Sequence, residues 1–303
     1  METKKVKTTA KALLGLSPVL FIVGAICLLP IFHNVYLSLT NFSIYRYFNY
    51  TFIGLKNYVS IFGNEMARFG GMLVWTFSYS FLALFFSFFI GTFLAILLNK
   101  KQVRLRKVYR TFLIIPWAVP AFITLLMWRG LLNYNFGAIN GFLEMLNLPK
   151  VPWLLEPNLA RFCAVFVTVW LGFPFFMVTV LGMLQSIPAE LYEAASIDGS
   201  SEFNKFKRIT LPLLLRPMLP VMILNFIMNF NNFGVYLLTE GGPAIGSAMN
   251  PGATDLMITY IFRLAFSIKR YGLAAAYAVI IFVFLAIFYL ISVKVSEKFV
   301  GEL

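Results

Sequence analysis

The chain has 303 residues, of which 60% are apolar and only 12% are charged, and its formal net charge is +13. Soluble domains are about 25% charged, so this chain has too few charged residues to cover a soluble core of its size. Having only two cysteines excludes a disulfide-rich scaffold. The composition therefore favours a protein that is solvated by lipid.

Six stretches lack Asp, Glu, Lys and Arg over eighteen or more residues each. About 20 apolar residues in a helix cross the hydrocarbon core of a bilayer, so each stretch predicts one span. They are 12–45, 69–99, 111–128, 162–189, 217–239 and 271–293. The first, with its helix at about 13–39, is too long for a cleaved signal peptide and is expected to be retained. In the third, Pro116 and Pro120 predict a helix broken at membrane depth. We expect an all-α, polytopic membrane protein with six transmembrane helices.

Basic residues between the spans predict the orientation. Segments 1–11, 99–110, 190–216 and 294–303 hold 16 Lys and Arg in 60 residues. Segments 46–68, 129–161 and 240–270 hold 9 in 87 residues. Positive charge marks the cytoplasmic side, so both termini are expected in the cytoplasm. The basic charge is spread along the loops and is suited to anionic lipid, and no soluble basic module predicts a nucleic-acid partner.

Catalytic and metal-binding patterns are missing from the sequence. The single histidine, His33, has no carboxylate in its span, and no His, Cys and Glu cluster has the spacing of metal ligands. There is no phosphate-binding GxxxxGK[ST] loop. We therefore expect no cofactor in this chain, and any ATP and Mg²⁺ would be bound by a partner chain. A transport scaffold that is not an enzyme is the favoured interpretation, and a polytopic membrane enzyme is a less favoured alternative.

Residues 188–212 predict a short helix, a tight turn and a second short helix. Pro188 suits the first turn of a helix, Gly199 can adopt the left-handed conformation that ends one, and Ser200 or Ser201 can cap the next. The first helix carries a compact apolar surface of a size that fits a groove on a partner. This surface is formed by Leu191, Tyr192, Ala194 and Ala195. On shape alone, an ordinary loop between helices is an equal alternative.

The same segment contains Glu193-Ala194-Ala195, three residues, Gly199, nine residues, Ile209, one residue and Leu211-Pro212. This string matches the EAA loop of ABC importer membrane subunits at every fixed position, so the chain resembles that family. The resemblance implies the type I permease fold in a single transmembrane domain over 1–303. Its five-helix core would lie at about 72–293 and its coupling loop at 188–212. It also implies that Glu193, Ala194, Ala195 and Gly199 contact an ATPase subunit.

Other segments resemble the carbohydrate-uptake branch of the family. They are Phe52–Tyr58, Leu237–Pro243 and Tyr271–Ala276. Within the branch, Asn133–Asn140, Trp170–Pro174 and Asn229–Phe233 are similar to the larger membrane subunit of maltose and maltodextrin importers. The chain lacks the extra N-terminal spans and the large external insertion of the enteric subunit, so no docking contact through that insertion is expected.

This resemblance implies import of an oligosaccharide, most simply maltose or a maltodextrin, across the cell membrane of a bacterium or archaeon. The implied partners are a second, homologous permease subunit, two ATP-binding-cassette ATPase subunits and an extracytoplasmic sugar-binding protein. Another oligosaccharide or a sugar phosphate is the alternative cargo.

The fifth predicted span supplies amides for a sugar site. Asn225, Asn229 and Asn232 follow steps of four and three, which place them on one face of a helix, and a polar face is expected to point away from lipid. Asparagines that only join helices are the alternative. By resemblance, Asn225, Met228, Asn229 and Asn232 contact the sugar, and Trp117, Ala121, Gly172 and Phe175 also line the pocket. The maltose subunit has Tyr in place of Trp117 and Ser in place of Ala121, which is consistent with a different linkage or chain length.

Overall fold

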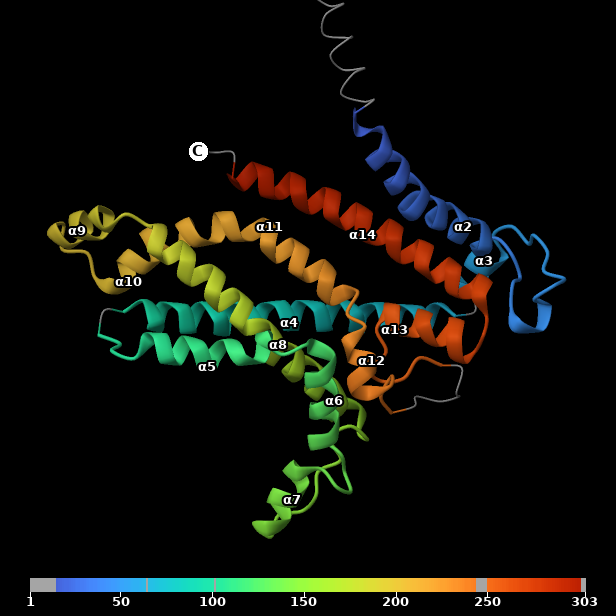
Figure 1. Cartoon of the computed structure of the whole chain (residues 1–303), viewed down its shortest axis with the longest axis horizontal. Helices are drawn as coiled ribbons and strands as arrows, with labels where there is room; N and C mark the ends of the chain where they lie inside the picture. Colours follow the sequence, from blue (N-terminus) through green and yellow to red (C-terminus); the bar gives the residue numbers. More distant parts are fainter. Residues whose placement is uncertain (1–14, 64, 101, 244–249, 301–303) are drawn as a thin grey trace, which may run out of the picture. The chain divides into compact units, whose positions relative to one another are not determined.

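The computed structural model describes residues 15–63, 65–100, 102–243 and 250–300. Within these ranges the chain is helical apart from its loops and one isolated antiparallel bridge between Thr40 and Phe52, as Figure 1 shows. The expected all-α class is confirmed. The chain divides into two compact units, described here separately. Unit 1 comprises the described parts of 1–65 and 261–282, and unit 2 those of 66–260 and 283–303.

Five helices in the described residues are long and apolar enough to cross a membrane. They are Gly15–Ser38, Met66–Asn99, Pro157–Ser186, Glu202–Phe230 and Tyr271–Glu297. A sixth crossing is obtained when α5 (Arg106–Ala118) and α6 (Ala121–Leu131), which meet at an angle of 88°, are counted as one broken span. The predicted six spans therefore correspond to five long helices and one broken pair.

The first span, in unit 1, ends in α2 (Leu29–Ser38) after a π-helical turn at Gly24–Leu28. Pro30 lies at the start of α2, and because proline has no N–H to donate, the helix changes its hydrogen-bond pattern here. The side chains of this span are largely exposed within the described chain, as expected for a helix that faces lipid or a partner.

The segment of unit 1 that follows α2 is held by side chains of the Phe52–Tyr58 motif. Asn57 Nδ2 donates to the carbonyl oxygens of Ser38 at 2.8 Å and Thr40 at 2.9 Å, and these carbonyls lie at the end of α2. The hydroxyls of Tyr58 and Ser38 are 2.7 Å apart. The motif therefore ties α3 (Lys56–Phe62) to the end of the first span.

In unit 2, α4 (Met66–Asn99) packs along α8 (Pro157–Ser186). A Cβ added at Gly91 would lie 2.7 Å from the carbonyl oxygen of Phe173, and one at Gly172 would lie 2.8 Å from Ser87 Oγ. Membrane helices approach closely where small residues remove side-chain bulk. These two glycines therefore determine how tightly α4 and α8 pack.

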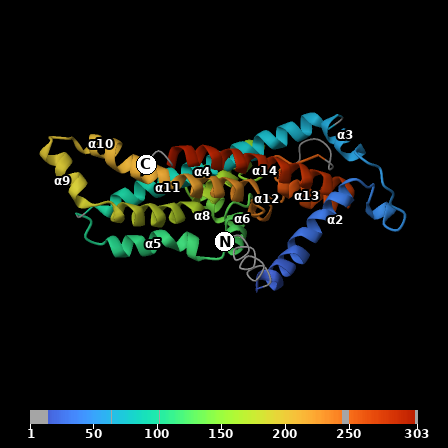
Figure 2. The same cartoon turned by 90° about the horizontal axis from the view of Figure 1, so that it is seen from above.

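The break between α5 and α6 follows from its two prolines. A residue before proline disfavours the α conformation, and Val119 is accordingly extended, with φ −82° and ψ 137°. Pro120 then precedes the first residue of α6. In Figure 2, α5 runs beside α8, whereas α6 packs against α12 (Gly234–Thr239).

The fifth predicted span is also broken, and this corrects one expectation. Its helix α11 (Leu211–Phe230) ends before Asn232, so the three asparagines do not share one helical face. The next helix, α12, begins two residues later, and the backbone N–H of Gly234 donates to Asn232 Oδ1 at 2.8 Å. A side chain that bonds to the backbone in this way competes with helix continuation, which explains the break.

The remaining helices of the described chain are α7 (Ala138–Met145), α9 (Ala189–Ile197), α10 (Glu202–Lys205), α13 (Met257–Phe262) and α14 (Tyr271–Val300). Within unit 2, α14 packs on α11 through aromatic pairs. The ring centroids are 4.8 Å apart for Phe226 and Phe288 and 5.4 Å apart for Phe230 and Phe284.

Candidate functional site

A cavity of about 800 Å³ lies in unit 2 among α5, α6, α8, α11 and α12. We call it the central cavity. All eight residues that the sequence analysis placed in a sugar pocket line it. They are Trp117, Ala121, Gly172, Phe175, Asn225, Met228, Asn229 and Asn232. The volume is within the range of ligand pockets, about 300–1,000 Å³.

Flat apolar surface in the cavity comes from α5 and α8. The ring centroids of Trp117 and Phe175 are 6.2 Å apart and the rings are inclined by 50°. Trp117 is 54% exposed and Met228, on α11, is 73% exposed. Because α5 ends at Ala118 and α6 begins at Ala121, the proline break brings Trp117 and Ala121 to the same wall.

Hydrogen-bonding capacity comes from an amide pair on α11. Asn229 Nδ2 donates to Asn225 Oδ1 at 2.8 Å, and both side chains are half-buried. In the described part of the chain, neither Asn225 Nδ2 nor Asn229 Oδ1 has a protein partner. The pair therefore presents one donor group and one acceptor for the hydroxyls of a ligand.

Asn232 is bonded differently. Its Nδ2 donates to Tyr79 Oη at 2.8 Å, while its Oδ1 accepts from Gly234 N. The Tyr79 hydroxyl also lies 2.7 Å from Thr168 Oγ1. Asn232 thus joins helices, as the alternative interpretation of these asparagines predicted, and it also lines the cavity.

Sequence reasoning missed Thr168, which lines the cavity, and Tyr79, which supports it from α4. Thr168 could have been found, because it precedes Gly172 and Phe175 by four and seven residues on one face of α8. Tyr79 is fully buried, and only the packing of α4 on α8 brings it near Asn232. No sequence signal reveals that approach.

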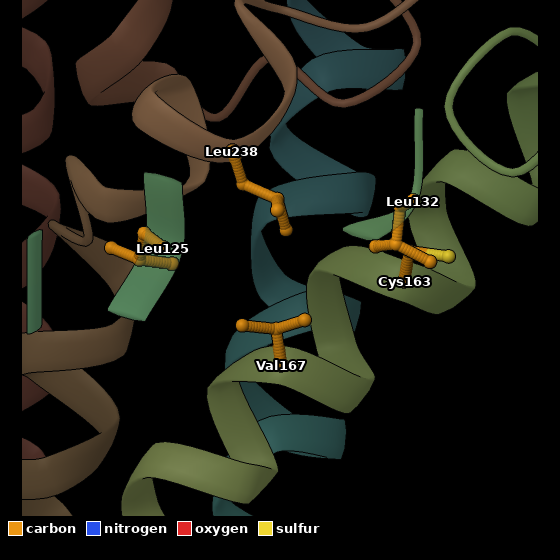
Figure 3. Packing of buried hydrophobic residues seen from close by; sticks show 5 residues of the cluster. All are labelled: Leu125, Leu132, Cys163, Val167 and Leu238. Atoms are coloured by element: carbon orange, nitrogen blue, oxygen red, sulfur yellow. The ribbon is translucent and has the colours of Figure 1, made fainter. Parts of the chain in front are cut away.

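An apolar layer adjoins the central cavity. It consists of Leu125, Leu132, Cys163, Val167 and Leu238, all buried (Figure 3). Leu125 and the partly buried Leu171 and Leu237, which pack on the layer, also line the cavity. Cys163 accordingly serves as a small core residue. The layer therefore extends from the wall of the cavity to the ends of α6 and α12.

The predicted coupling loop, residues 188–212, lies at one end of unit 2, where α9 and α10 meet (Figures 1 and 2). The helix α9 begins directly after Pro188. Gly199 has φ +75°, and Ser201 Oγ accepts from the backbone N–H of Asn204 at 3.3 Å. The predicted left-handed turn and serine cap are both present, with Ser201 rather than Ser200 as the cap.

The residues expected to contact an ATPase are accessible. Glu193, Ala194 and Gly199 are exposed, and Ala195 is half-buried. The hydroxyl of Tyr192 lies 2.9 Å from Thr210 Oγ1, which fixes one side of α9. Exposed apolar residues that the sequence analysis did not include enlarge the surface. They are Ile197, 86% exposed, and Phe203, 71% exposed.

Metal ligation has no candidate in the part of the chain that the structure describes. No group of three or more His, Cys, Asp or Glu side chains there is placed to hold an ion.

Known proteins with similar sequences are transport components. The sequence model of the family described as "Binding-protein-dependent transport system inner membrane component" matches residues 87–300. The galactooligosaccharides transport system permease protein GanP of Bacillus subtilis (strain 168) is 37% identical over 292 residues, which cover 94% of this chain and 70% of GanP. The maltose/maltodextrin transport system permease protein MalF of Escherichia coli (strain K12) is 40% identical over 251 residues, or 80% of this chain and 49% of MalF. The chain thus matches only about half the length of MalF.

Solved structures show the same fold. A chain of a bacterial alginate ABC transporter, in complex with an alginate pentasaccharide-bound periplasmic protein, aligns with a TM-score of 0.75 at 21% identity. The alignment covers 98% of this chain and 97% of that one. A chain of the inward-facing MetNI methionine ABC transporter aligns with a TM-score of 0.52 at 17% identity, over 78% and 98% of the two chains.

Proposed function

The chain belongs to the family of inner membrane components of binding-protein-dependent transport systems, as a multi-pass permease of the sugar ABC importers. From this premise we propose that it translocates a neutral oligosaccharide, in the first place maltose or a maltodextrin. The alternative that the chain is a membrane enzyme is set aside, because the relatives of the chain are transport permeases.

The central cavity is the observation that carries the proposed cargo. A pyranose ring has apolar C–H faces and a rim of hydroxyls, so it is bound best by flat aromatic groups together with a few polar groups. Trp117 and Phe175 supply the faces, and the Asn225–Asn229 pair supplies a donor and an acceptor. We assign the sugar to these four residues and to Ala121, Gly172 and Met228, with Asn232 holding the wall in place.

The charge of the cavity bears on the alternative cargoes. No Lys or Arg is among the described residues that line it, whereas phosphate recognition relies on such cations. A sugar phosphate is therefore disfavoured. A galacto-oligosaccharide is the second candidate, because GanP matches 94% of the chain. Trp117 in place of the tyrosine of the maltose subunit is consistent with either neutral cargo.

The proposed assembly contains a second, homologous permease, two ATPase subunits that bind ATP and Mg²⁺, and an extracytoplasmic sugar-binding protein. We place it in the cell membrane with both termini of this chain in the cytoplasm, following the distribution of basic residues. The exposed face of α9, with Glu193, Ala194, Ala195 and Gly199 beside it, would fit a groove on one ATPase. Closure of the ATPases on ATP would then move this loop and open the cavity to the outer side of the membrane, opposite the ATPases.

Uptake by the complete complex in proteoliposomes tests the proposal. Labelled maltotriose, a galactotriose and a maltose phosphate would be compared at sub-saturating concentration with the matching binding protein. We expect Asn229→Ala to lower maltotriose uptake about tenfold, which corresponds to about 1.4 kcal/mol, the size of one good hydrogen bond. ATP hydrolysis without sugar should not change.

The matched control is Asn231→Ala. Asn231 is exposed, lies two residues from Asn229 and does not line the cavity, so its replacement should leave uptake unaltered. If Asn229→Ala transports as well as Asn231→Ala, the sugar binds elsewhere. If the galactotriose alone is transported, the cavity assignment stands and maltodextrin is replaced as the cargo.

A further inference from the structure

A second cavity, of about 390 Å³, lies beside the central cavity in unit 2. We call it the rim cavity. The helices α6 and α12 run from one cavity to the other. Leu125 and Leu237 line the central cavity, and Leu132 and Leu238, further along the same two helices or just beyond them, line the rim cavity. The two cavities are therefore consecutive along a shared wall.

The apolar layer separates them. Leu132 and Leu238 are 5% and 1% exposed and pack with Leu125, Cys163 and Val167, as seen in Figure 3. A layer of leucine and valine presents no hydrogen-bonding partners, so a hydroxyl-rich molecule would cross it only when α6 and α12 move apart. A molecule that reaches the rim cavity would therefore stay there until the apolar layer opens.

The polar side chains of the rim cavity are suited to a neutral ligand. Arg129 Nη1 lies 2.7 Å from Glu240 Oε1, and the two side chains remain 40% and 59% exposed. Together they carry no net charge, yet a guanidinium has five N–H donors and a carboxylate several acceptor positions. Because both side chains are partly exposed, the remaining donors of Arg129 and acceptors of Glu240 are available to a ligand.

The segment after α6 adds further groups. Asn133 Oδ1 accepts from the backbone N–H groups of Asn135 at 2.9 Å and Phe136 at 3.2 Å. Its Nδ2 has no acceptor among the described residues and remains available as a donor. The side chains of Tyr134 and Asn135 are exposed and line the same cavity. Aromatic surface, amides and a neutral ion pair thus occur in one hollow, the combination that carbohydrates require.

We propose that the rim cavity is a second carbohydrate site, which holds the end of a neutral oligosaccharide before the apolar layer opens. This inference rests on the proposed function, since it takes the cargo to be a sugar. It adds a site outside the central cavity, with Arg129, Asn133, Tyr134, Asn135, Thr239 and Glu240 as its polar residues.

Photocrosslinking distinguishes this site from the central cavity. A maltotetraose that carries a diazirine would be supplied to the complete transporter and its binding protein, illuminated, and located by fragment mass spectrometry. We expect labels at residues 132–135 as well as at 225–232, and excess unlabelled maltotetraose should suppress both. The double variant Tyr134→Ala with Asn135→Ala should lower labelling at the rim about tenfold while uptake can still be measured.

The double variant is designed so that it should still fold. The contact that holds Tyr134 to Asn140 uses the backbone oxygen of Tyr134, which the substitution retains. Phe136→Ala is the matched control, because Phe136 is 79% exposed and is not among the rim residues, and it should label as the unaltered chain does. The yield of assembled complex is measured for each.

Two outcomes reject different claims. Labelling confined to the central cavity, or rim labelling unchanged in the double variant, overturns the second site and leaves the proposed function intact. Absence of labelling at both cavities, together with no uptake of maltotetraose, rejects maltodextrin as the cargo and so the first form of the proposed function.

Discussion

Asn232 Nδ2 donates a 2.8 Å hydrogen bond to the hydroxyl of Tyr79, 153 residues away in the sequence. This bond joins the break between α11 and α12 to α4. Since Asn232 Oδ1 also accepts from Gly234 N, one side chain both interrupts the fifth span and anchors the interruption. The wall of the central cavity depends on it.

Loss of the Asn232 side chain should therefore reduce stability more than it affects recognition. Asn232→Ala leaves the Gly234 N–H and the Tyr79 hydroxyl with fewer partners, and an unmet buried group costs about 1–3 kcal/mol. We expect a lower thermal midpoint for the purified complex in detergent, with Asn231→Ala unchanged. In a double-mutant cycle with Tyr79→Phe, the two losses should not add; simple additivity would contradict the coupling.

Gly199 should be required for coupling and not for membrane insertion. Its φ of +75° disfavours any side chain, although a Cβ there would meet nothing within 4 Å. Gly199→Val should strain the turn by about 1–3 kcal/mol and uncouple sugar-stimulated ATP hydrolysis in the reconstituted complex. Gly182→Ala, in helical backbone with equally open surroundings, should behave as the unaltered chain. Normal coupling in Gly199→Val would reduce the loop to a linker.

Gly91 should be intolerant of even one added methyl group. Its Cβ would lie 2.7 Å from both the Phe173 carbonyl oxygen and Phe176 Cβ, so Gly91→Ala should force α4 and α8 apart at a cost of about 1–3 kcal/mol. The measurement is the thermal midpoint and yield of the assembled complex. Gly70→Ala on the same helix, with nothing within 4 Å, is the control, and equal stability of the two variants would argue against this packing.

Cysteine labelling checks the orientation of the chain. In a background of Cys27→Ser and Cys163→Ala, Leu148→Cys should react with an impermeant maleimide added outside the cell. Leu148 is 49% exposed and precedes Lys150 in a segment predicted to be external. Ser196→Cys, in the coupling loop, should react only after the membrane is opened. The reverse labelling pattern would contradict the predicted orientation of the chain in the membrane.

Much of the fold could be predicted because its causes are local. The spans follow from charge-free stretches of membrane length, and the bend after α5 follows from the effect of Pro120 on Val119. The turn at Gly199 follows from the freedom of glycine at positive φ. Each of these effects involves residues that are neighbours in the chain.

The contacts inside the candidate site were less accessible to sequence reasoning. The eight lining residues were named by resemblance and by helical spacing, and they do line one cavity. The spacing argument was nevertheless wrong for Asn232, because a regular helix was assumed through the break. The segments Asn133–Asn140 and Leu237–Pro243 were singled out by resemblance, but nothing in the sequence showed that they line one cavity, since they are brought together only by the fold.

The sequence by itself thus determined the membrane class, the positions of the spans and the turn at Gly199, because hydrophobic length, proline and glycine act within a few residues. Only the tertiary structure decided which polar groups are spent on packing and which remain for a ligand. It assigns Asn232 to Tyr79 and Gly234, and leaves groups of Asn225 and Asn229 facing the cavity. A hydrogen bond between distant residues depends on how helices pack, and that packing is a property of the whole fold.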